Sequence, residues 1–577
     1  MQTINTIIMV LISIIPVTIL GDNLSNWIII LLGIFYLLKN KPVLIYKKVL
    51  LVSLGLLGWS VISILIYGIK IDQIASMGTY IVIPLYYLVF KSMYTITGIK
   101  EMKKMINITV IATAVVALGY ILYLGIYYNV RVYGNLGYAN SYALLILILL
   151  NINCKFNENK YGKVINVIYM LTILYTGSRT TLILLVVNIL YIEFRRYKHV
   201  LFETFIVSLL LFVMLEYVPI LGIVALPLIL YLFYEFKGFN KSKILCGISI
   251  ILITSFTLFL KVNTFERIGN ISSSNGSLQE RLLTFSDVIK NLKLFGYGIG
   301  TFQYKQFKIQ SGFYDIKYIH NSILHTSFEL GIVGGILLAV IIIMSLIKLY
   351  KNRDFDKVFL LLIIVIHSMM DFDFIYSPII ILLLFTLTYD NKVLVKERYS
   401  FKYKIPIILL IFISTGVIFN ETILRVSYLS VLYENFNISK KISEINLFHD
   451  WRIYQIRSDS FIKNTHSEFS EKDLKTSEEA LINGLKAHEE NVLIKWNLAY
   501  VYEKLNNSKG KELRIQLVHE EKYNSQSYKE AYKYIKHDEK ILPILNKIYS
   551  EANGNRSFRT KYLKNQLGAT LEDTLKD

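Results

Sequence analysis

The feature that most constrains this chain is a series of long apolar runs that fills residues 1–420 and stops there. A helix that spans a bilayer needs about 20 mostly apolar residues. Because backbone groups in lipid must hydrogen-bond within their own segment, such runs predict a bundle of transmembrane α-helices. Downstream of residue 420 no run is long enough to span, so residues 421–577 are predicted to form a soluble domain.

Fifteen runs qualify or nearly qualify as spans, and flanking Tyr, Asn or Ser residues extend the shorter ones. The fold class is therefore predicted to be all-α, a polytopic bundle of about 12–15 spans followed by an extracytoplasmic α-helical domain. The runs are 4–20, 24–38, 49–68, 78–90, 106–127, 139–152, 163–176, 180–194, 199–216, 219–235, 244–260, 324–347, 357–370, 376–389 and 404–420.

The positive charge of the chain reports membrane topology and gives no reason to expect a nucleic-acid partner. The chain has 62 Lys+Arg and 42 Asp+Glu, and residues 1–420 hold +18 of the net +20. One alternate set of short loops contains 26 of these basic residues, whereas the opposite short loops contain only Lys70, Arg131 and Arg179. Since cytoplasmic loops are rich in Lys and Arg, the N-terminus is predicted to be cytoplasmic. An odd number of spans then places the C-terminal domain outside.

Two of the three basic residues in the predicted outer short loops lie in distinctive motifs. Arg131 lies in Asn129-Val-Arg-Val-Tyr-Gly134, with Asn140 at the head of the next run, and Arg179 lies in Gly177-Ser-Arg-Thr180. Each arginine alone is explained equally well by a side chain that reaches the lipid headgroups. Two such arginines on the side that normally avoids them favour an anionic ligand, because the planar guanidinium binds phosphate bidentately.

The long predicted outer loop, residues 261–323, adds Arg281 and a histidine. Gly296-Tyr-Gly-Ile-Gly300 is interpreted as a tight turn rather than a nucleotide loop, because no βαβ context surrounds it. His320 precedes a long apolar run, and Asn321 or Ser322 is placed to cap that helix. A histidine at a membrane boundary is often unremarkable, but its pKa near neutrality also suits a general base.

A second histidine lies in His367-Ser-Met-Met-Asp-Phe-Asp373, at the predicted outer end of a span. His367 and Asp371 are one helical turn apart, and ionisable groups at that depth are candidates for function. The alternative, which is favoured for His367, is a mutually satisfied interhelical pair.

Together these motifs resemble the O-antigen ligase and polymerase family of lipid-linked glycan transferases. The resemblance rests on Arg-Val-x-Gly with a following Asn, then Gly-Ser-Arg-Thr, the arginine-initiated helix, and Gly-x-Gly-x-Gly-Thr-Phe. It continues with His-Asn-Ser, with Glu329-Leu-Gly-Ile-Val-Gly334, and with His-Ser-x-x-Asp. The similarity covers roughly residues 100–390, and its most specific part is His320 through Gly334.

The resemblance implies a metal-independent glycosyl transfer at the outer face of a bacterial cytoplasmic membrane, in surface polysaccharide biosynthesis. The implied donor is a glycan on a polyprenyl pyrophosphate such as undecaprenyl pyrophosphate, and the acceptor is a glycan, a lipid or a protein. His320 is implied as the catalytic base, and Arg131, Arg179 and Arg281 as the arginines that hold the pyrophosphate. Asn140, Asn321, Glu329, His367 and Asp371 are supporting candidates, and no cofactor or metal is expected.

The chemistry agrees with this resemblance independently. Attack at the anomeric carbon expels a pyrophosphate, which requires cations where negative charge develops. Attack from the opposite face inverts the anomeric configuration. Asp315 and Glu329 are close to His320 in sequence, so either is a candidate to orient it.

The tail, residues 421–577, contains apolar residues at helical spacing. The stretch Glu478–Lys504, with Trp496-Asn-Leu-Ala-Tyr-Val-Tyr502, is similar to a tetratricopeptide helix pair. It is interpreted either as a helical-repeat domain that binds a protein partner or as a helical cap on the bundle.

Two other functions remain open. A transporter or flippase for lipid-linked sugars also needs basic residues facing a cavity, but no clear two-half repeat is visible. A non-catalytic membrane scaffold is the third interpretation, in which loss of His320 changes nothing.

Overall fold

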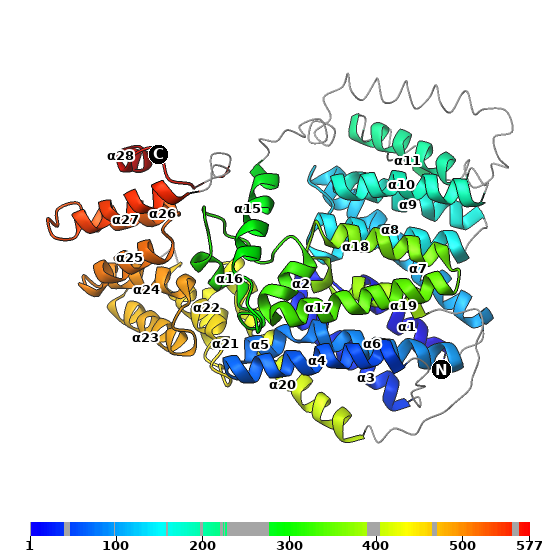
Figure 1. The fold of residues 1–577 in the computed structure, drawn as a ribbon, viewed down its shortest axis with the longest axis horizontal. Coiled ribbons are helices and arrows are strands. Elements are labelled where there is room, and N and C mark those ends of the chain that lie inside the picture. The colour runs from blue at the N-terminus through cyan, green and yellow to red at the C-terminus, as the bar shows by residue number, and fades with distance from the viewer. Residues whose placement is uncertain are drawn as a thin grey trace. The chain divides into compact units, whose positions relative to one another are not determined.

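The computed structural model describes residues 2–39, 47–96, 99–156, 160–196, 200–217 (with 219, 223, 226 and 227), 276–388, 404–463, 470–556, 563 and 565–576. Across these residues the regular secondary structure is entirely helical (Figure 1). The predicted all-α class is confirmed. The chain divides into two compact units, which are described one at a time.

Every predicted span with a described core is helical. The first run is interrupted at Ile15-Pro16, because proline removes a helical donor and clashes with the preceding turn. Runs 219–235 and 244–260 lie almost wholly outside the described residues, so the count of about 15 spans stays a prediction. Within the described residues, seven helical stretches are long and apolar enough to cross a membrane: Asp22–Lys39, Lys48–Tyr67, Ile71–Met93, Glu101–Tyr127, Ala139–Phe156, Ser322–Lys351 and Pro406–Leu432.

Unit 1 comprises residues 1–53, 81–271 and 340–405. Its elements are α1 (Gln2–Ile14), α2 (Val17–Leu20), α3 (Asp22–Lys39), the start of α4 (Lys47–Tyr67), most of α6 (Gly78–Ile96), α7 (Ile99–Tyr120), the π-helix η1 (Ile121–Tyr127), η2 (Gly134–Leu136), α8 (Ala139–Phe156), α9 (Lys160–Thr176), α10 (Arg179–Arg196), α11 (Val200–Tyr217), the end of α17 (Ser322–Lys351), α18 (Phe355–Ser368), η4 (Asp373–Ile375) and α19 (Ser377–Thr388).

Helix α8 is the centre of unit 1. Thirteen of its 18 residues are buried, and it packs against α7, α9, α10, α18 and α19. These five neighbours cover α8 on most of its surface. The two ends of α8 therefore lie among the ends of its neighbours, and polar residues there are brought together from distant parts of the sequence.

Unit 2 comprises residues 54–80, 272–339 and 406–577. It contains the rest of α4, α5 (Ile71–Ser76), α15 (Gly276–Lys290), α16 (Phe302–Lys305), η3 (Gln306–Lys308), the first part of α17, most of α20 (Lys404–Leu432), α21 (Phe436–Ile442), α22 (Trp451–Ile462), α23 (Glu471–Ala487), α24 (Val492–Lys504), α25 (Lys509–Glu520), α26 (Ser525–Ile535), α27 (Leu542–Asn555) and α28 (Leu571–Lys576).

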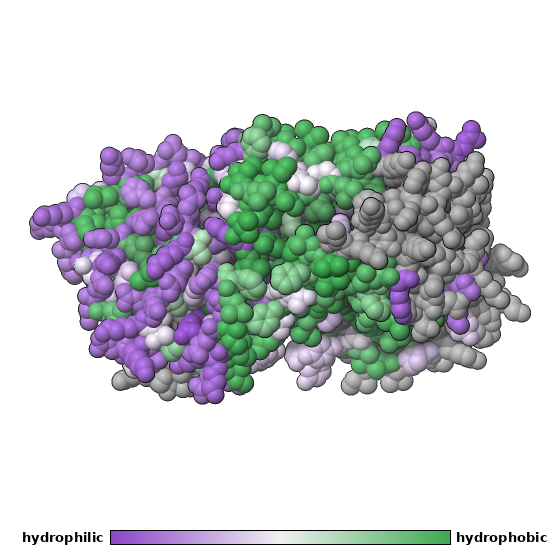
Figure 2. Space-filling view, turned by 90° about the horizontal axis from the view of Figure 1, so that it is seen from below, coloured by the Kyte–Doolittle hydropathy of each residue, from purple (hydrophilic) through white to green (hydrophobic). Residues whose placement is uncertain are grey.

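The helices after α21 pack in chain order, α22 on α23, α23 on α24, α24 on α25 and α25 on α26. Four of them begin at a side chain that accepts a backbone N–H, namely Asp450, Ser470, Asn491 and Asn524. Figure 2 shows hydrophilic residues over these C-terminal helices, in contrast to the apolar surface of the spanning helices. Helix α20 crosses the predicted domain boundary at residue 420 without a break, and both this boundary and the tetratricopeptide-like character stay predictions.

Candidate functional site

Arg131 of unit 1 joins the end of one helix to the start of another. Its Nε donates to the carbonyl of Thr176 at 2.7 Å, and Nη2 donates to Oδ1 of Asn140 at 2.9 Å. Thr176 is the last residue of α9, whose final carbonyls have no partner within the helix. The structure thus brings Arg131 and Asn140, two predicted site residues, into direct contact.

Asn140 extends this contact to Asp371. The Asn140 amide donates to Oδ2 of Asp371 at 2.8 Å, and the hydroxyl of Tyr138 donates to the other carboxylate oxygen at 2.8 Å. The Tyr138 ring stacks on Phe372 with 4.6 Å between ring centroids. Asp371 is completely buried. The side-chain amide of Asn140 bonds to both Asp371 and Arg131 and so links the two charged groups. Such a buried network fixes the guanidinium, since any rotation breaks several bonds.

His367 belongs to a second chain of hydrogen bonds in unit 1. Its Nδ1 lies 2.7 Å from Oδ2 of Asp373, and its Nε2 lies 2.9 Å from the hydroxyl of Thr181 in α10. The other Asp373 oxygen accepts from Ser141 of α8 at 2.8 Å. Both ring nitrogens are engaged, which is the geometry of a satisfied interhelical pair. The partner is Asp373, a second carboxylate in the same apolar stretch, and not the predicted Asp371.

Arg179 differs from Arg131 in its surroundings. It is the first residue of α10, two positions before Thr181. Within the described residues no hydrogen bond or ion pair engages its partly exposed side chain. A helix N-terminus carries partial positive charge, so the guanidinium and the helix end attract an anion together.

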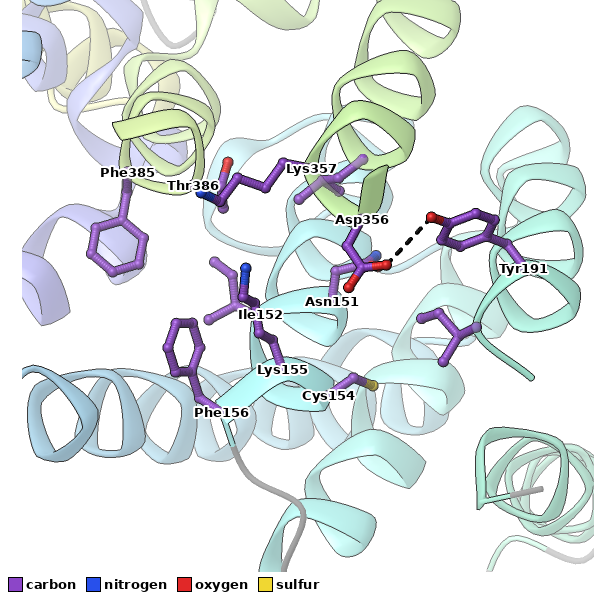
Figure 3. Close-up of a pocket in the computed structure, with 12 residues that line it drawn as sticks. Asn151, Ile152, Cys154, Lys155, Phe156, Tyr191, Asp356, Lys357, Phe385 and Thr386 are labelled. Carbon is purple, nitrogen blue, oxygen red and sulfur yellow. Dashed lines mark hydrogen bonds between the residues drawn. The ribbon is translucent and has the colours of Figure 1, made fainter. Parts of the chain in front are cut away.

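A pocket lies at the opposite end of these helices. Figure 3 shows it between α8, α10, α18 and α19, with Lys155, Tyr191, Asp356 and Lys357 in its lining. The Tyr191 hydroxyl donates to Asp356 at 3.3 Å, and Arg195 pairs with the same carboxylate at 3.3 Å. The basic residues here come from three of the predicted cytoplasmic loops. None of the predicted site residues lines this pocket.

His320 of unit 2 lies two residues before the start of α17. Asn321 caps this helix, because its Oδ1 accepts the backbone N–H of Ile323 at 3.0 Å and of Leu324 at 2.9 Å. Asn321 is therefore the one of the two expected caps whose side chain accepts these bonds. The capped helix start fixes the backbone on which His320 stands.

Helix α15 places Glu280 where the charges of both His320 and Arg281 act on its carboxyl. Burial raises the pKa of the Glu280 carboxyl, while the charges of His320 and Arg281 lower it and that of Asp315 raises it. Glu280 was not singled out from the sequence, although it directly precedes Arg281. A carboxyl with a raised pKa beside a histidine and an arginine is typical of functional sites.

Asp315 and Glu329, the two acids expected to orient His320, contact other side chains in the structure. Asp315 accepts a bond from the amide of Gln306 at 3.3 Å. The carboxylate of Glu329 lies 3.6 Å from Nε2 of His325, on the same helix. Backbone N–H groups of Gly300 and Phe302 also bond to Glu329, which ties the glycine motif to α17. An orienting role for Asp315 or Glu329 stays a prediction.

The glycine motif makes a close backbone crossing with α17. Gly331 has φ 78° and interrupts the helical backbone there, and Gly296 has φ 76°. A Cβ on Gly296 would lie 2.3 Å from the Gly331 nitrogen, and one on Gly331 would lie 2.1 Å from the Leu294 carbonyl oxygen. Tyr297 N–H donates to the Phe328 carbonyl at 2.9 Å across this crossing. The glycines thus permit backbone contact, in agreement with the tight-turn interpretation.

The C-terminal helices contact the segment that carries His320, and both belong to unit 2. We call residues 291–321, between α15 and α17, the His320 segment. Phe307 of this segment packs in one buried cluster with Val492 and Leu517. Lys308 pairs with Glu490 at 2.6 Å. The C-terminal helices therefore brace the His320 segment by both apolar and ionic contacts.

An all-helical fold with several apolar helices of spanning length defines a multi-pass membrane protein. Residues 218–339 match the family model described as O-antigen ligase, so this segment of the chain is similar to that family. The predicted resemblance is confirmed in this segment, which contains Arg281, His320, Asn321 and Glu329. A comparison with curated proteins gives no match. Among the described residues no group of three or more His, Cys, Asp or Glu side chains is arranged to hold a metal ion, and metal independence stays a prediction.

Proposed function

We propose that this protein transfers or polymerises a glycan from a polyprenyl-pyrophosphate donor to an acceptor hydroxyl at the outer face of a bacterial cytoplasmic membrane. The observation that carries the proposal is the O-antigen ligase match over residues 218–339, which includes His320 and Arg281. The product is a surface polysaccharide, either lengthened by polymerisation or attached to its acceptor.

In this proposal His320 is the general base. The acceptor oxygen bonds to the anomeric carbon as its proton passes to His320, and the bond from that carbon to the pyrophosphate oxygen breaks. The lipid pyrophosphate leaves with the electron pair, and the anomeric configuration inverts. Histidine is the side chain that most often takes up a proton from a reacting group in enzymes.

The arginines are proposed to bind the pyrophosphate. Arg131 supports this role by its fixed orientation, since two of its donors are held by Thr176 and Asn140. Arg179 supports it by its position at a helix N-terminus. Arg281 supports it by lying on α15 among the groups that act electrostatically on Glu280. Cations placed before the reaction stabilise the leaving group without reorganisation.

The decisive experiment is transfer in vitro by the full-length protein in nanodiscs. Lipid-linked oligosaccharide and candidate acceptors are supplied to wild type, His320→Ala and the control His537→Ala, an exposed histidine of the C-terminal helices. We expect His320→Ala to lose about 10²–10⁴-fold in turnover, with donor binding retained and His537→Ala unchanged. Equal transfer by wild type and His320→Ala contradicts the base assignment.

The same assay separates the enzyme from the alternative, a lipid-linked sugar flippase. A flippase moves the donor across proteoliposome membranes without any change in the glycan bond, and it yields no coupled product. Detection of a new glycosidic bond, with inverted configuration by NMR, supports the enzyme. Translocation without product supports the alternative.

A further inference from the structure

Helix α20 of unit 2 carries exposed apolar side chains and, at residues 420–421, buried polar contacts. Up to Phe419 its large exposed side chains are apolar, including Phe412 at 78% exposure. Asn420 and Glu421 follow and are buried against polar partners: Asn420 donates to Asp450 at 2.7 Å, and Glu421 pairs with Arg452 at 2.5 Å. We call Asn420, Glu421, Asp450 and Arg452 the polar ring, and beyond it α20 still exposes Val426 and Leu432.

The length of the helix identifies this ring as a membrane boundary. From Lys404 to Asn420 the helix rises about 24 Å at 1.5 Å per residue. This distance approaches the hydrocarbon thickness of a bilayer, about 30 Å. Charged pairs such as Glu421–Arg452 are costly within hydrocarbon. The bilayer therefore ends close to the ring, and Gly416 lies one turn inside it.

The segment that follows α21 returns across this boundary. The ring of Phe448 lies 3.6 Å from the position of a Cβ on Gly416, one turn on the membrane side of Asn420. Phe448 is 43% exposed, and its neighbours Leu447 and Ile445 are 68% and 44% exposed. Phe448 thus lies at a level where the surface of α20 is apolar, and two further exposed apolar side chains lie within three residues of it in sequence.

The loop that presents them is well braced. Asn446 accepts the backbone N–H of Asp450 at 2.8 Å and donates to the Asp450 carbonyl at 3.0 Å. Asp450 in turn binds Asn420 and Arg452, so the loop is fixed to the polar ring. A loop held by such bonds cannot collapse to hide its apolar side chains. Exposed apolar groups of this kind mark an interaction surface.

We propose that residues 444–449 insert Ile445, Leu447 and Phe448 into the bilayer leaflet next to the C-terminal domain. Lipid is the occupant because the loop continues the apolar surface of α20, which itself crosses the bilayer. The exposed Lys441, just before the loop, suits the phosphate level of the headgroups. The C-terminal domain is thereby anchored to the membrane at a second point besides α20. This anchor does not depend on the proposed transferase activity.

The test places a fluorophore on the loop of the full-length protein in nanodiscs. In a background with Cys154 and Cys246 changed to serine, Leu447→Cys and the control Ile544→Cys are each labelled with bimane. Ile544 is a matched control because it is a 45% exposed apolar residue, on α27. Quenching is then measured with lipids that carry a nitroxide high on the acyl chain and with aqueous iodide.

Interfacial elements bury their apolar face about 5–10 Å deep, so we expect about threefold weaker iodide quenching at position 447 than at 544. Nitroxide lipids should quench position 447 and leave 544 nearly unchanged. Equal iodide quenching at both sites overturns the proposal. Protection from iodide without quenching by lipid also overturns it, because a protein surface then covers the loop. Ile445→Cys repeats the test should Leu447→Cys fail to fold.

Discussion

The hydrogen-bond network around Arg131 and the surroundings of His320 are built by different means. In unit 1, side chains from separate helices satisfy one another, as in the bonds of Asn140 and Tyr138 to Asp371 at 2.8 Å. In unit 2, backbone contacts at glycines shape the segment, and burial raises the pKa of the neighbouring Glu280. The first arrangement holds charges in place, which suits anion binding. The second perturbs acid groups near a histidine, which suits proton transfer.

The largest expected effect tests the backbone contacts of the second region. Gly296→Ala places a Cβ 2.3–2.4 Å from backbone atoms of Gly331 and Glu329 and forces a positive φ on alanine. Overpacking and this strain together should cost about 4 kcal/mol of unfolding free energy. We expect poor expression or a strongly lowered Tm in detergent, together with loss of transfer.

Gly58→Ala is the matched control, because a Cβ at Gly58 of α4 meets nothing within 4 Å. It should leave both Tm and activity close to wild type. If Gly296→Ala is as stable as Gly58→Ala, the close backbone contact between the glycine motif and α17 does not stabilise the His320 segment.

The second prediction concerns the brace that the C-terminal helices give to this region. Burial is the main cause that raises the pKa of the Glu521 carboxyl from 4.5 to about 7, and the charge of Asp315 in the His320 segment acts in the same direction. Hydrogen bonds from Ser527, Trp496 and Asn524 lower this pKa and oppose the rise. The folded protein therefore binds a proton between pH 4.5 and 7 that the unfolded chain releases. This stabilising contribution is full below pH 4.5 and is lost as the pH rises through 7.

The shift corresponds to about 3 kcal/mol. Hydrogen exchange of α24–α26, corrected for the intrinsic rate, should show weaker protection at pH 8 than at pH 5. Glu521→Gln should reduce this difference, whereas Glu551→Gln, at an exposed position, should preserve it. Equal pH dependence in wild type and Glu521→Gln argues against a buried titrating carboxyl.

The smallest predicted effect separates the two arginines of unit 1. Arg131→Lys gives up at least one of the bonds to Thr176 and Asn140, so it should lower the unfolding free energy by about 1–2 kcal/mol and also weaken donor binding. Arg179→Lys should weaken donor binding and leave Tm unchanged, because no bond to Arg179 is present in the described part of the chain. Thermal unfolding and donor titration of both variants measure the two effects. Unchanged donor binding in both variants excludes the pyrophosphate role.

Much of the fold could be predicted from local pattern. Apolar runs become helices wherever the structure describes their core, since the need to satisfy backbone groups acts on each run separately. The capping position at Asn321 was also predictable, because a cap is a contact over three residues. Asp373 and Glu280 were missed, since a carboxylate becomes informative only once its distant neighbours are known.

The sequence by itself determined the helical class, the membrane character and the motifs that resemble the O-antigen ligase family, because these follow from hydropathy, charge distribution and short-range spacing. The tertiary structure alone decided which of those residues meet. It joined Arg131 to Asn140 and Asn140 to Asp371, the latter across 231 positions of sequence, gave His367 the partner Asp373, and brought Phe448 back beside Gly416. Such pairings depend on how helices pack in three dimensions, and helix packing is set by many weak contacts at once rather than by any local pattern.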